Sequence, residues 1–266
     1  MPTIFGMLRV KNEARWIRRV IEAIQPVCQR IFVLDDHSTD GTPAICQQIH
    51  CDVTRSEFAS LNESRDKDWL LSKLYGAIPL HDQHWTRGNP ASPYWALAID
   101  GDEELVRGDA GHILNAVLRP SAHAYHLRIP YLWNDPAHIR VDRVYRRFEN
   151  LGRPSLFRLM NQSFRFLRTP FGRGLNGEPV NFHCSSIPQE LLGGAQPCPA
   201  RLMHWGYMNA SDRLRKYEWY NAIDPANQAE DCYRHIVQGD VPEIPINAVL
   251  RHAGPLQLEA VQWQAS

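Results

Sequence analysis

Three features that would restrict the class of protein are missing from this sequence. Its six cysteines include no Cys-X-X-Cys pair, so they indicate neither a zinc ribbon nor a redox pair. No apolar run approaches the ~18 residues of a membrane span, and the opening MPTIFGMLRVKNEARW lacks the basic start and long apolar run of a signal peptide. We therefore expect a cytoplasmic protein with free thiols and no transmembrane segment, and peripheral membrane association stays open.

Net charge is also absent. The chain carries 29 Lys and Arg against 29 Asp and Glu, so no overall field draws it to nucleic acid, and no nucleic-acid partner is expected. One segment is strongly basic, because the stretch from Arg140 to Arg173 contains nine arginines and only two acidic residues. The simplest interpretation of this arginine-rich segment is a solvated face, and the alternative is an acceptor-binding or phosphate-binding surface.

The 266 residues, 44% of them hydrophobic, suffice for one large domain or two small ones. Short apolar runs that indicate buried strands occur at 3–10, 31–34, 51–54 and 94–99. Helical patterns lie between them: one after Asn12, its expected cap, and others at about 44–49 and 62–75. This alternation predicts a parallel sheet covered on both faces. The second half is less regular, with a strand expected at 124–131 and a helix at 211–220.

Polar residues follow three of the expected strands. They are Asn12-Glu13 after the first strand, Asp35-Asp36 after the second and Asp100-Gly101-Asp102 after the fourth. Because the carboxyl ends of parallel strands meet at one edge of a sheet, where ligands bind, these residues are expected to converge.

The residue types at these strand ends suggest their chemistry. Two carboxylates around a glycine, as at Asp100 and Asp102, are hard oxygen ligands of the kind that holds Mg²⁺ beside substrate phosphates. An acidic turn would have the same sequence. We expect Glu103 and Glu104 to support this site or to start a helix. Turn and capping chemistry explains 38–42 but not the doubled Asp35-Asp36, which suits a base NH or a ribose hydroxyl.

Taken together, these segments resemble the family-2 glycosyltransferases of the GT-A fold. The likeness rests on Asn12-Glu13, on VLDDHSTDGT at 33–42 and on AIDGDEEL at 98–105, which are similar to the family's DDGSTDGT-like segment and DxD-type metal motif. RLMHWGY at 201–207, followed by Arg213 and Lys216, is similar to a later segment of some members. His37 stands where the family usually has glycine, and we expect it to keep a negative φ.

The resemblance implies an α/β, GT-A (Rossmann-like) three-layer sandwich with a mostly parallel central sheet. It implies one domain over 1–240, with a nucleotide-sugar-binding half at 1–106 and an acceptor-binding half at 107–240, followed by a C-terminal extension at 241–266.

The activity implied is that of a metal-dependent inverting glycosyltransferase of hexosyltransferase type. It would use Mn²⁺ or Mg²⁺ and move a sugar from a nucleotide-diphosphate sugar to a glycan, lipid-linked sugar or peptide. One alternative is a sugar-phosphate nucleotidyltransferase, although the first strand lacks that class's Gly-rich loop. Another is a non-catalytic nucleotide-sugar-binding module, against which the retention of Asp100 and Asp102 argues.

The resemblance also implies roles for individual residues. The donor-binding set is Leu8, Arg9, Glu13, Asp35, Asp36, Arg65, Asp100 and Gly101. The metal-binding set is Asp100, Asp102 and His204, and the alternative role for His204 is a diphosphate contact.

The general base should come from the second half, where the family's Glu-Asp pair is not found. The candidates are Glu178, favoured because it lies in a Gly-rich loop, and Asp142. Glu190 and His183 are further options.

Overall fold

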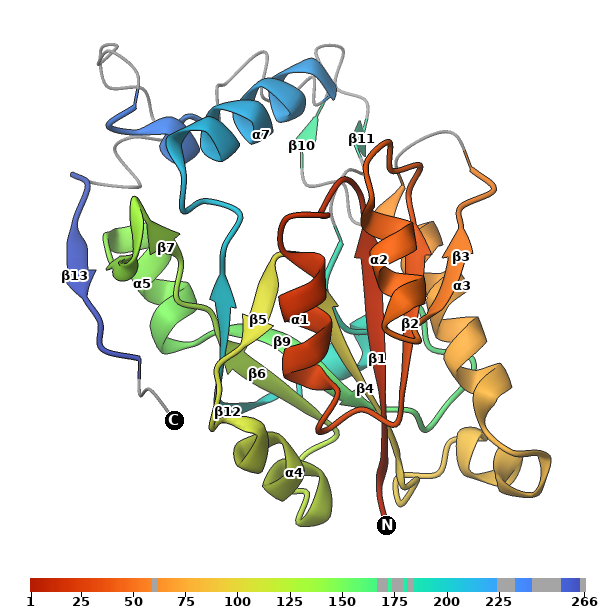
Figure 1. Ribbon diagram of the computed structural model, residues 1–266. Coiled ribbons are helices and arrows are strands. Elements are labelled where there is room, and N and C mark those ends of the chain that lie inside the picture. The colour runs from red at the N-terminus through yellow and green to blue at the C-terminus, as the bar shows by residue number, and fades with distance from the viewer. Residues whose placement is uncertain are drawn as a thin grey trace.

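The computed structural model describes residues 1–58, 62–166, 172–173, 179–180, 184–223, 233–240 and 255–263. Its centre is an eight-stranded sheet in the order β3-β2-β1-β4-β9-β6-β12-β5 (Figure 1). The strands are β1 (Thr3–Val10), β2 (Arg30–Asp35), β3 (Asp52–Arg55), β4 (Tyr94–Asp100), β5 (Glu103–Leu105), β6 (Ala124–Arg128), β9 (Arg153–Arg158) and β12 (Gln196–His204). The first four pair in parallel, as do β6 and β12, whereas β9 and β5 are antiparallel to their neighbours.

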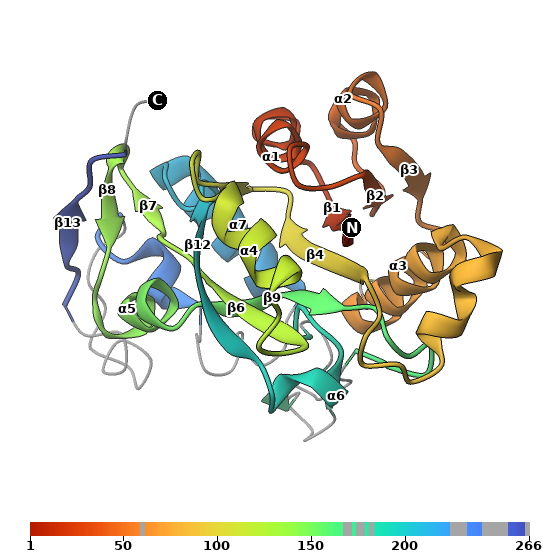
Figure 2. The ribbon, with the colours of Figure 1, turned by 90° about the horizontal axis from the view of Figure 1, so that it is seen from below.

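Helices cover both faces of this sheet, as the view from below shows (Figure 2). Alternate side chains of β1 enter two separate apolar clusters, because successive residues of a strand point to opposite faces. Ile4 and Leu8 pack in the cluster that includes α1 (Ile17–Ile24) and α4 (Ala110–Leu118). Phe5 and Met7 pack in the cluster that includes α3 (Glu63–Ala77). The predicted three-layer α/β fold with a mostly parallel sheet is confirmed.

Smaller elements complete the described chain. They are the helices α2 (Thr42–Gln48), α5 (Arg143–Asn150), α6 (Gln189–Leu192) and α7 (Ala210–Ile223), the 3-10 helices η1 (Leu80–Thr86) and η2 (Arg234–Val237), and the strands β7 (Leu132–Trp133), β8 (Asp135–Arg140), β10 (Gly172–Arg173), β11 (Pro179–Val180) and β13 (Leu258–Ala260). β13 pairs antiparallel with β8, so this part of the C-terminal region adds a strand to a small sheet in the order β13-β8-β7. The division at 106 and 240 stays a prediction.

Two local expectations are wrong, and one of two alternatives for a third is excluded. Asn12 does not cap α1, which begins at Ile17, because Asn12 has a φ of 55° and its Oδ1 accepts from the Thr39 amide at 2.8 Å. His37 also has a φ of 55°, in the left-handed region that glycine adopts most easily. Glu103 and Glu104 lie in β5, paired with β12, so they do not start a helix. The other expected role fits Glu103, whose carboxylate accepts from the Asp100 amide at 3.0 Å.

Two general properties of the described residues bear on the environment of the protein. In these parts of the chain, no helix combines the length and the apolar character needed to span a bilayer. Cys28, Cys46, Cys51, Cys184 and Cys198 are free thiols.

Candidate functional site

A cleft of about 720 Å³ opens at the carboxyl ends of β1 and β4. Arg9 of β1 lies opposite Asp100 of β4 in the register of the two parallel strands. The ends of both strands therefore place charged side chains at the cleft. The sheet side of the cleft and α3 contribute Arg9, Lys11, Asn12, Glu13, Glu63, Lys67 and 100–103. The second half of the chain contributes further lining residues, which include Tyr131, Arg153, His204, Tyr207, Arg215, Lys216, Trp219 and Tyr220. Six of the predicted site residues line the cleft: Arg9, Glu13, Asp100, Gly101, Asp102 and His204.

Arg153 holds the first carboxylate of the acidic motif. Its Nη1 donates to Asp100 Oδ2 at 2.9 Å, and its Nη2 donates to Glu103 Oε2. The same Glu103 oxygen accepts from the Asp100 amide at 3.0 Å, so one guanidinium group ties the β4–β5 turn together. Desolvation raises the pKa of a carboxyl, but the cations Arg153 and Lys67 outweigh it at Asp100 and hold that pKa well below its usual range.

Asp102 is deeper, with a side chain 3% exposed, and pairs with a different cation. Lys216 Nζ, from α7, lies 2.5 Å from Asp102 Oδ2, and His204 Nε2 lies 3.7 Å from the same oxygen. A Cβ at Gly206 would stand 1.9 Å from Asp102 Oδ2, and one at Gly101 would stand 2.9 Å from Glu13 Cγ. A side chain at either position would therefore force the neighbouring side chains out of their present contacts.

His204 is the last residue of β12 and is buried against an aromatic ring. Its imidazole stacks on Tyr131 with ring centroids 4.5 Å apart, and its amide donates to the Pro130 carbonyl at 3.0 Å. Burial lowers its pKa to about 4, so the ring is neutral near pH 7, the form that binds metals. Its buried Nδ1 has no hydrogen-bond partner within the described chain.

The side chains of Asp100, Asp102 and His204 are chemically suited to bind a divalent cation. Carboxylates at Asp100 and Asp102 with a neutral imidazole at His204 suit Mn²⁺, and the carboxylates alone suit Mg²⁺ held jointly with phosphate. Over the described residues, no three His, Cys, Asp or Glu side chains are gathered as a metal site. Instead, each carboxylate is paired with a cation of the chain itself, Asp100 with Arg153 and Asp102 with Lys216.

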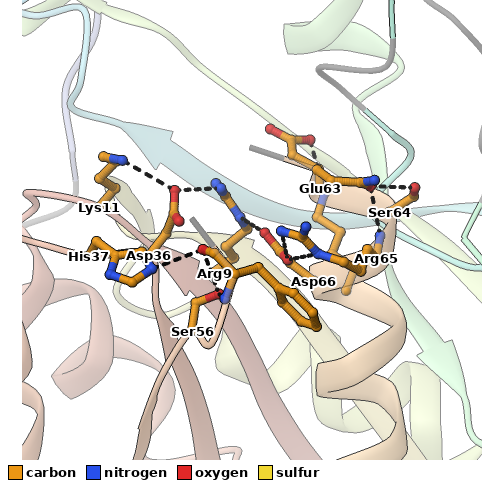
Figure 3. A network of polar contacts seen from close by, with 12 residues as sticks. Arg9, Lys11, Asp36, His37, Ser56, Glu63, Ser64, Arg65 and Asp66 are labelled. Carbon is orange, nitrogen blue, oxygen red and sulfur yellow. Dashed lines mark hydrogen bonds and ion pairs between the residues drawn. The ribbon is translucent and has the colours of Figure 1, made fainter. Parts of the chain in front are cut away.

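A second network lies beside the cleft and joins three of the predicted donor-binding residues (Figure 3). Arg9 donates from Nη2 to Asp36 Oδ2 at 2.6 Å and from Nε to Asp66 Oδ2 at 2.9 Å. Arg65 donates to the other oxygen of Asp66 from Nε and Nη2, at 2.9 and 2.7 Å. Lys11 Nζ approaches Asp36 Oδ2 at 3.5 Å. Asp66, which the sequence argument missed, is therefore the link between Arg9 and Arg65.

Two predicted donor-binding residues point into the protein instead. Leu8 is fully buried, and its strand is flanked by β2 and β4, so its side chain does not reach the cleft. Asp35 is 1% exposed, and its Oδ1 accepts from the Ser38 amide at 3.3 Å. Its carboxylate shapes the turn after β2.

The acidic candidates for a general base lie away from the lining of the cleft or outside the described residues. Asp142 is buried, and its Oδ2 accepts from Arg140 Nε at 2.5 Å. Glu190 lies in α6 and accepts from the Arg165 amide at 3.2 Å. Glu178 and His183 lie outside the described residues.

The arginine-rich segment is not simply a solvated face. Arg140 has no exposed surface and Arg158 is 6% exposed, whereas Arg153 reaches the acids of the cleft. The sequence gives little sign of this role, because Arg153 meets Asp100 only through the antiparallel pairing of β9 with β4.

The helix that carries Lys216 is anchored by its neighbour Arg213, which lies one turn earlier. The Arg213 guanidinium pairs with Asp240 at 2.6 Å and donates to the carbonyls of Tyr207 and Met208. It also lies over the Trp133 ring, 4.2 Å from its centroid, and Arg140 lies 4.4 Å from the same centroid. These contacts fix the start of α7 against β7 and η2.

No family model matches the chain. Two uncharacterized proteins, from Mycobacterium tuberculosis and Mycobacterium bovis, are each 26% identical to it over 231 residues, which is 84% of this chain and 51% of theirs. The chain thus spans about half the length of the curated relatives it matches.

Among solved structures, residues 1–349 of S. aureus TarS give a TM-score of 0.49 at 11% identity, with 89% of this chain and 70% of that chain covered. Glucosyl-3-phosphoglycerate synthase from M. tuberculosis, in complex with phosphoglyceric acid, gives 0.32 at 19% identity, covering 49% and 44%. The same enzyme in complex with Mn²⁺ and UDP-glucose gives 0.30 at 17% identity, again covering 49% and 44%. These scores and identities are low, so the functional argument rests on the residues of this chain.

Proposed function

We propose that this protein is a metal-dependent inverting glycosyltransferase of hexosyltransferase type that uses a nucleotide-diphosphate sugar. The observation that carries the proposal is the meeting of Asp100 and Asp102 with Arg153, Lys216 and His204 in one cleft at the carboxyl ends of parallel strands. Carboxylates for a cation beside basic groups for an anion are the combination that a metal–diphosphate pair requires.

Different parts of the cleft suit different parts of such a donor. Lys67, Arg153 and Lys216 line it and supply positive charge for the diphosphate. The Arg9–Asp36–Asp66–Arg65 network at its side offers donors and acceptors for a nucleoside. Asp100, Asp102 and His204 would hold Mn²⁺ or Mg²⁺, which when bound neutralises charge on the leaving diphosphate.

The chain's own groups then account for a single displacement. The acceptor hydroxyl oxygen forms a bond to the anomeric carbon, the bond from that carbon to the diphosphate oxygen breaks, and its electron pair leaves with the diphosphate. Arg153 and Lys216 stabilise the charge that develops there. The hydroxyl proton passes to a general base, for which Glu178 stays our prediction.

The aromatic part of the lining suits the acceptor. Tyr131, Tyr207, Trp219 and Tyr220 are among the residues that line the cleft. Aromatic rings combine apolar faces with a polar edge, which suits molecules that carry both C–H faces and hydroxyl groups. A glycan, a lipid-linked sugar and a peptide bearing a hydroxyl all meet this description.

A thermal-shift panel tests the donor site. UDP-, GDP- and dTDP-glucose are each added with Mn²⁺, with Mg²⁺ or with EDTA, and at least one donor is expected to raise the melting temperature in a metal-dependent way, because ligand bound to the native state stabilises it. Asp102→Asn, which keeps the side-chain volume, should remove the metal-dependent part.

A flat panel, or an Asp102→Asn protein that behaves like wild type, would contradict the proposal. If a donor does bind, the release of nucleotide from that donor is measured next on the wild-type protein. Binding without turnover would indicate a binding module, and pyrophosphate release from a nucleoside triphosphate would indicate a nucleotidyltransferase.

A further inference from the structure

Lys216 already occupies the carboxylate that the proposed metal would use. Its Nζ lies 2.5 Å from Asp102 Oδ2, with the Lys216 side chain 19% exposed and the Asp102 side chain 3% exposed. A divalent cation bound by Asp102 would lie close to Lys216 Nζ, and like charges at such separations repel strongly. The two therefore compete for Asp102.

The fold is shaped around this ion pair. A Cβ at Gly206 would lie 1.9 Å from Asp102 Oδ2 and 2.4 Å from Lys216 Nζ, so only glycine leaves room for the contact. The preceding residue, Trp205, donates its amide to the Asp102 carbonyl at 2.9 Å and stacks on Trp16 with centroids 5.1 Å apart. The segment between β12 and α7 is thus held directly against the acidic motif.

The two cations in the cleft differ in how firmly they are held. Arg153 uses two nitrogens to bridge Asp100 and Glu103, a planar arrangement that resists displacement. Lys216 makes one ion pair in the described part of the chain, to Asp102, from the end of a flexible four-carbon stem. Lys216 is therefore the cation that can exchange partners.

We propose that Lys216 is a built-in counter-ion that yields Asp102 to the divalent cation and moves to the donor's diphosphate. The inference rests on the proposed function. Without the donor, a metal ion must displace Lys216 from a buried carboxylate, so metal alone binds weakly. The diphosphate gives Nζ another anionic partner, so binding of metal and of diphosphate is positively coupled, and by linkage each strengthens the other.

The test is Lys216→Met, which keeps an unbranched side chain but removes the charge. Titration of Mn²⁺, followed through the electron paramagnetic resonance signal of the free ion, is expected to show about tenfold tighter binding than in wild type, because a positive charge next to the site is gone. The nucleoside diphosphate of the donor that binds best in the panel, measured by calorimetry in EDTA, is expected to bind about tenfold more weakly.

Arg215→Met is the matched control. It removes one positive charge from the adjacent position of α7 and from the lining of the same cleft, but Arg215 pairs with Asp212 rather than with Asp102. Its Mn²⁺ affinity is expected to stay within about twofold of wild type, since the charge it removes is not in contact with the metal ligands. If Lys216→Met does not fold, Lys216→Gln serves in the same two titrations.

The opposite changes in the two affinities separate the proposal from a purely structural role, which would weaken both. Mn²⁺ binding that is unchanged or weaker in the Lys216 variant overturns the inference while leaving the proposed function intact, provided that wild type binds the nucleotide with metal. A wild-type protein that binds neither Mn²⁺ nor any of UDP, GDP and dTDP overturns both.

Discussion

At the scale of single residues, Gly206 decides whether the acidic site can form. Replacing it with alanine places a Cβ where Asp102 Oδ2 and Lys216 Nζ now lie. We expect Gly206→Ala to lower the free energy of unfolding by about 1–3 kcal/mol through overpacking, and to abolish metal-dependent nucleotide binding. Denaturant melts and the thermal-shift panel measure the two effects.

Gly111→Ala is the control for this substitution. No atom lies within 4 Å of a Cβ at Gly111, which is in α4 and has no left-handed φ. Alanine there should raise the free energy of unfolding by about 0.5–1 kcal/mol, because it reduces the entropy of the unfolded chain. A Gly206→Ala protein that behaved like Gly111→Ala would show that the ion pair does not need the space.

At the scale of elements, Arg153 joins β9 to the turn between β4 and β5. Arg153→Met would leave Glu103, which has no exposed surface, without its cation. We expect the free energy of unfolding to fall by about 3 kcal/mol or more, the usual result of breaking a buried pair from one side. Equilibrium unfolding in urea at neutral pH measures it.

Arg18→Met is the control for the loss of stability expected in Arg153→Met. Arg18 pairs with Glu22 at 3.6 Å on the surface of α1, with both side chains about half exposed. The loss expected there is below about 1 kcal/mol, because exposed pairs are screened by water. Equal losses in the two variants would mean that Arg153 does not hold the turn.

The elements also show which features the sequence could predict. β1 and the Asp100–Asp102 turn follow from a local apolar run and the polar residues after it, so their positions were predictable. The start of α1 was not, because Asn12 adopts a positive φ to contact Thr39 in another loop. Arg153 and Asp66 escaped prediction for a similar reason, since their partners are 53 and 57 residues away.

At the scale of the whole molecule, β13 of the C-terminal region covers one edge of β8. β13 pairs with β8, Val261 N donates to the Ala137 carbonyl at 2.7 Å, and Trp263 Nε1 donates to the Pro136 carbonyl at 2.6 Å. Ending the chain at residue 254 should lower the free energy of unfolding by about 1–3 kcal/mol, at about 1 kcal/mol net per lost hydrogen bond. It should also promote self-association through the exposed strand.

Chemical denaturation and size-exclusion chromatography at several concentrations measure both effects of the truncation. Ending the chain at Trp263 is the control, because β13 and its bonds are retained. A shortened chain as stable and as monodisperse as this control would mean that β13 contributes nothing to closing the edge.

The anchoring of α7 has a consequence for the speed of ligand binding. Arg213 is clamped by Asp240 and lies over Trp133, and Lys216 follows one helical turn later. A partner change at Lys216 is therefore a rotation about side-chain bonds on a stationary helix. Rotamer changes are much faster than the microseconds to milliseconds of domain motions. Donor association should accordingly follow a single kinetic phase whose rate rises linearly with concentration, with no plateau set by a slow rearrangement.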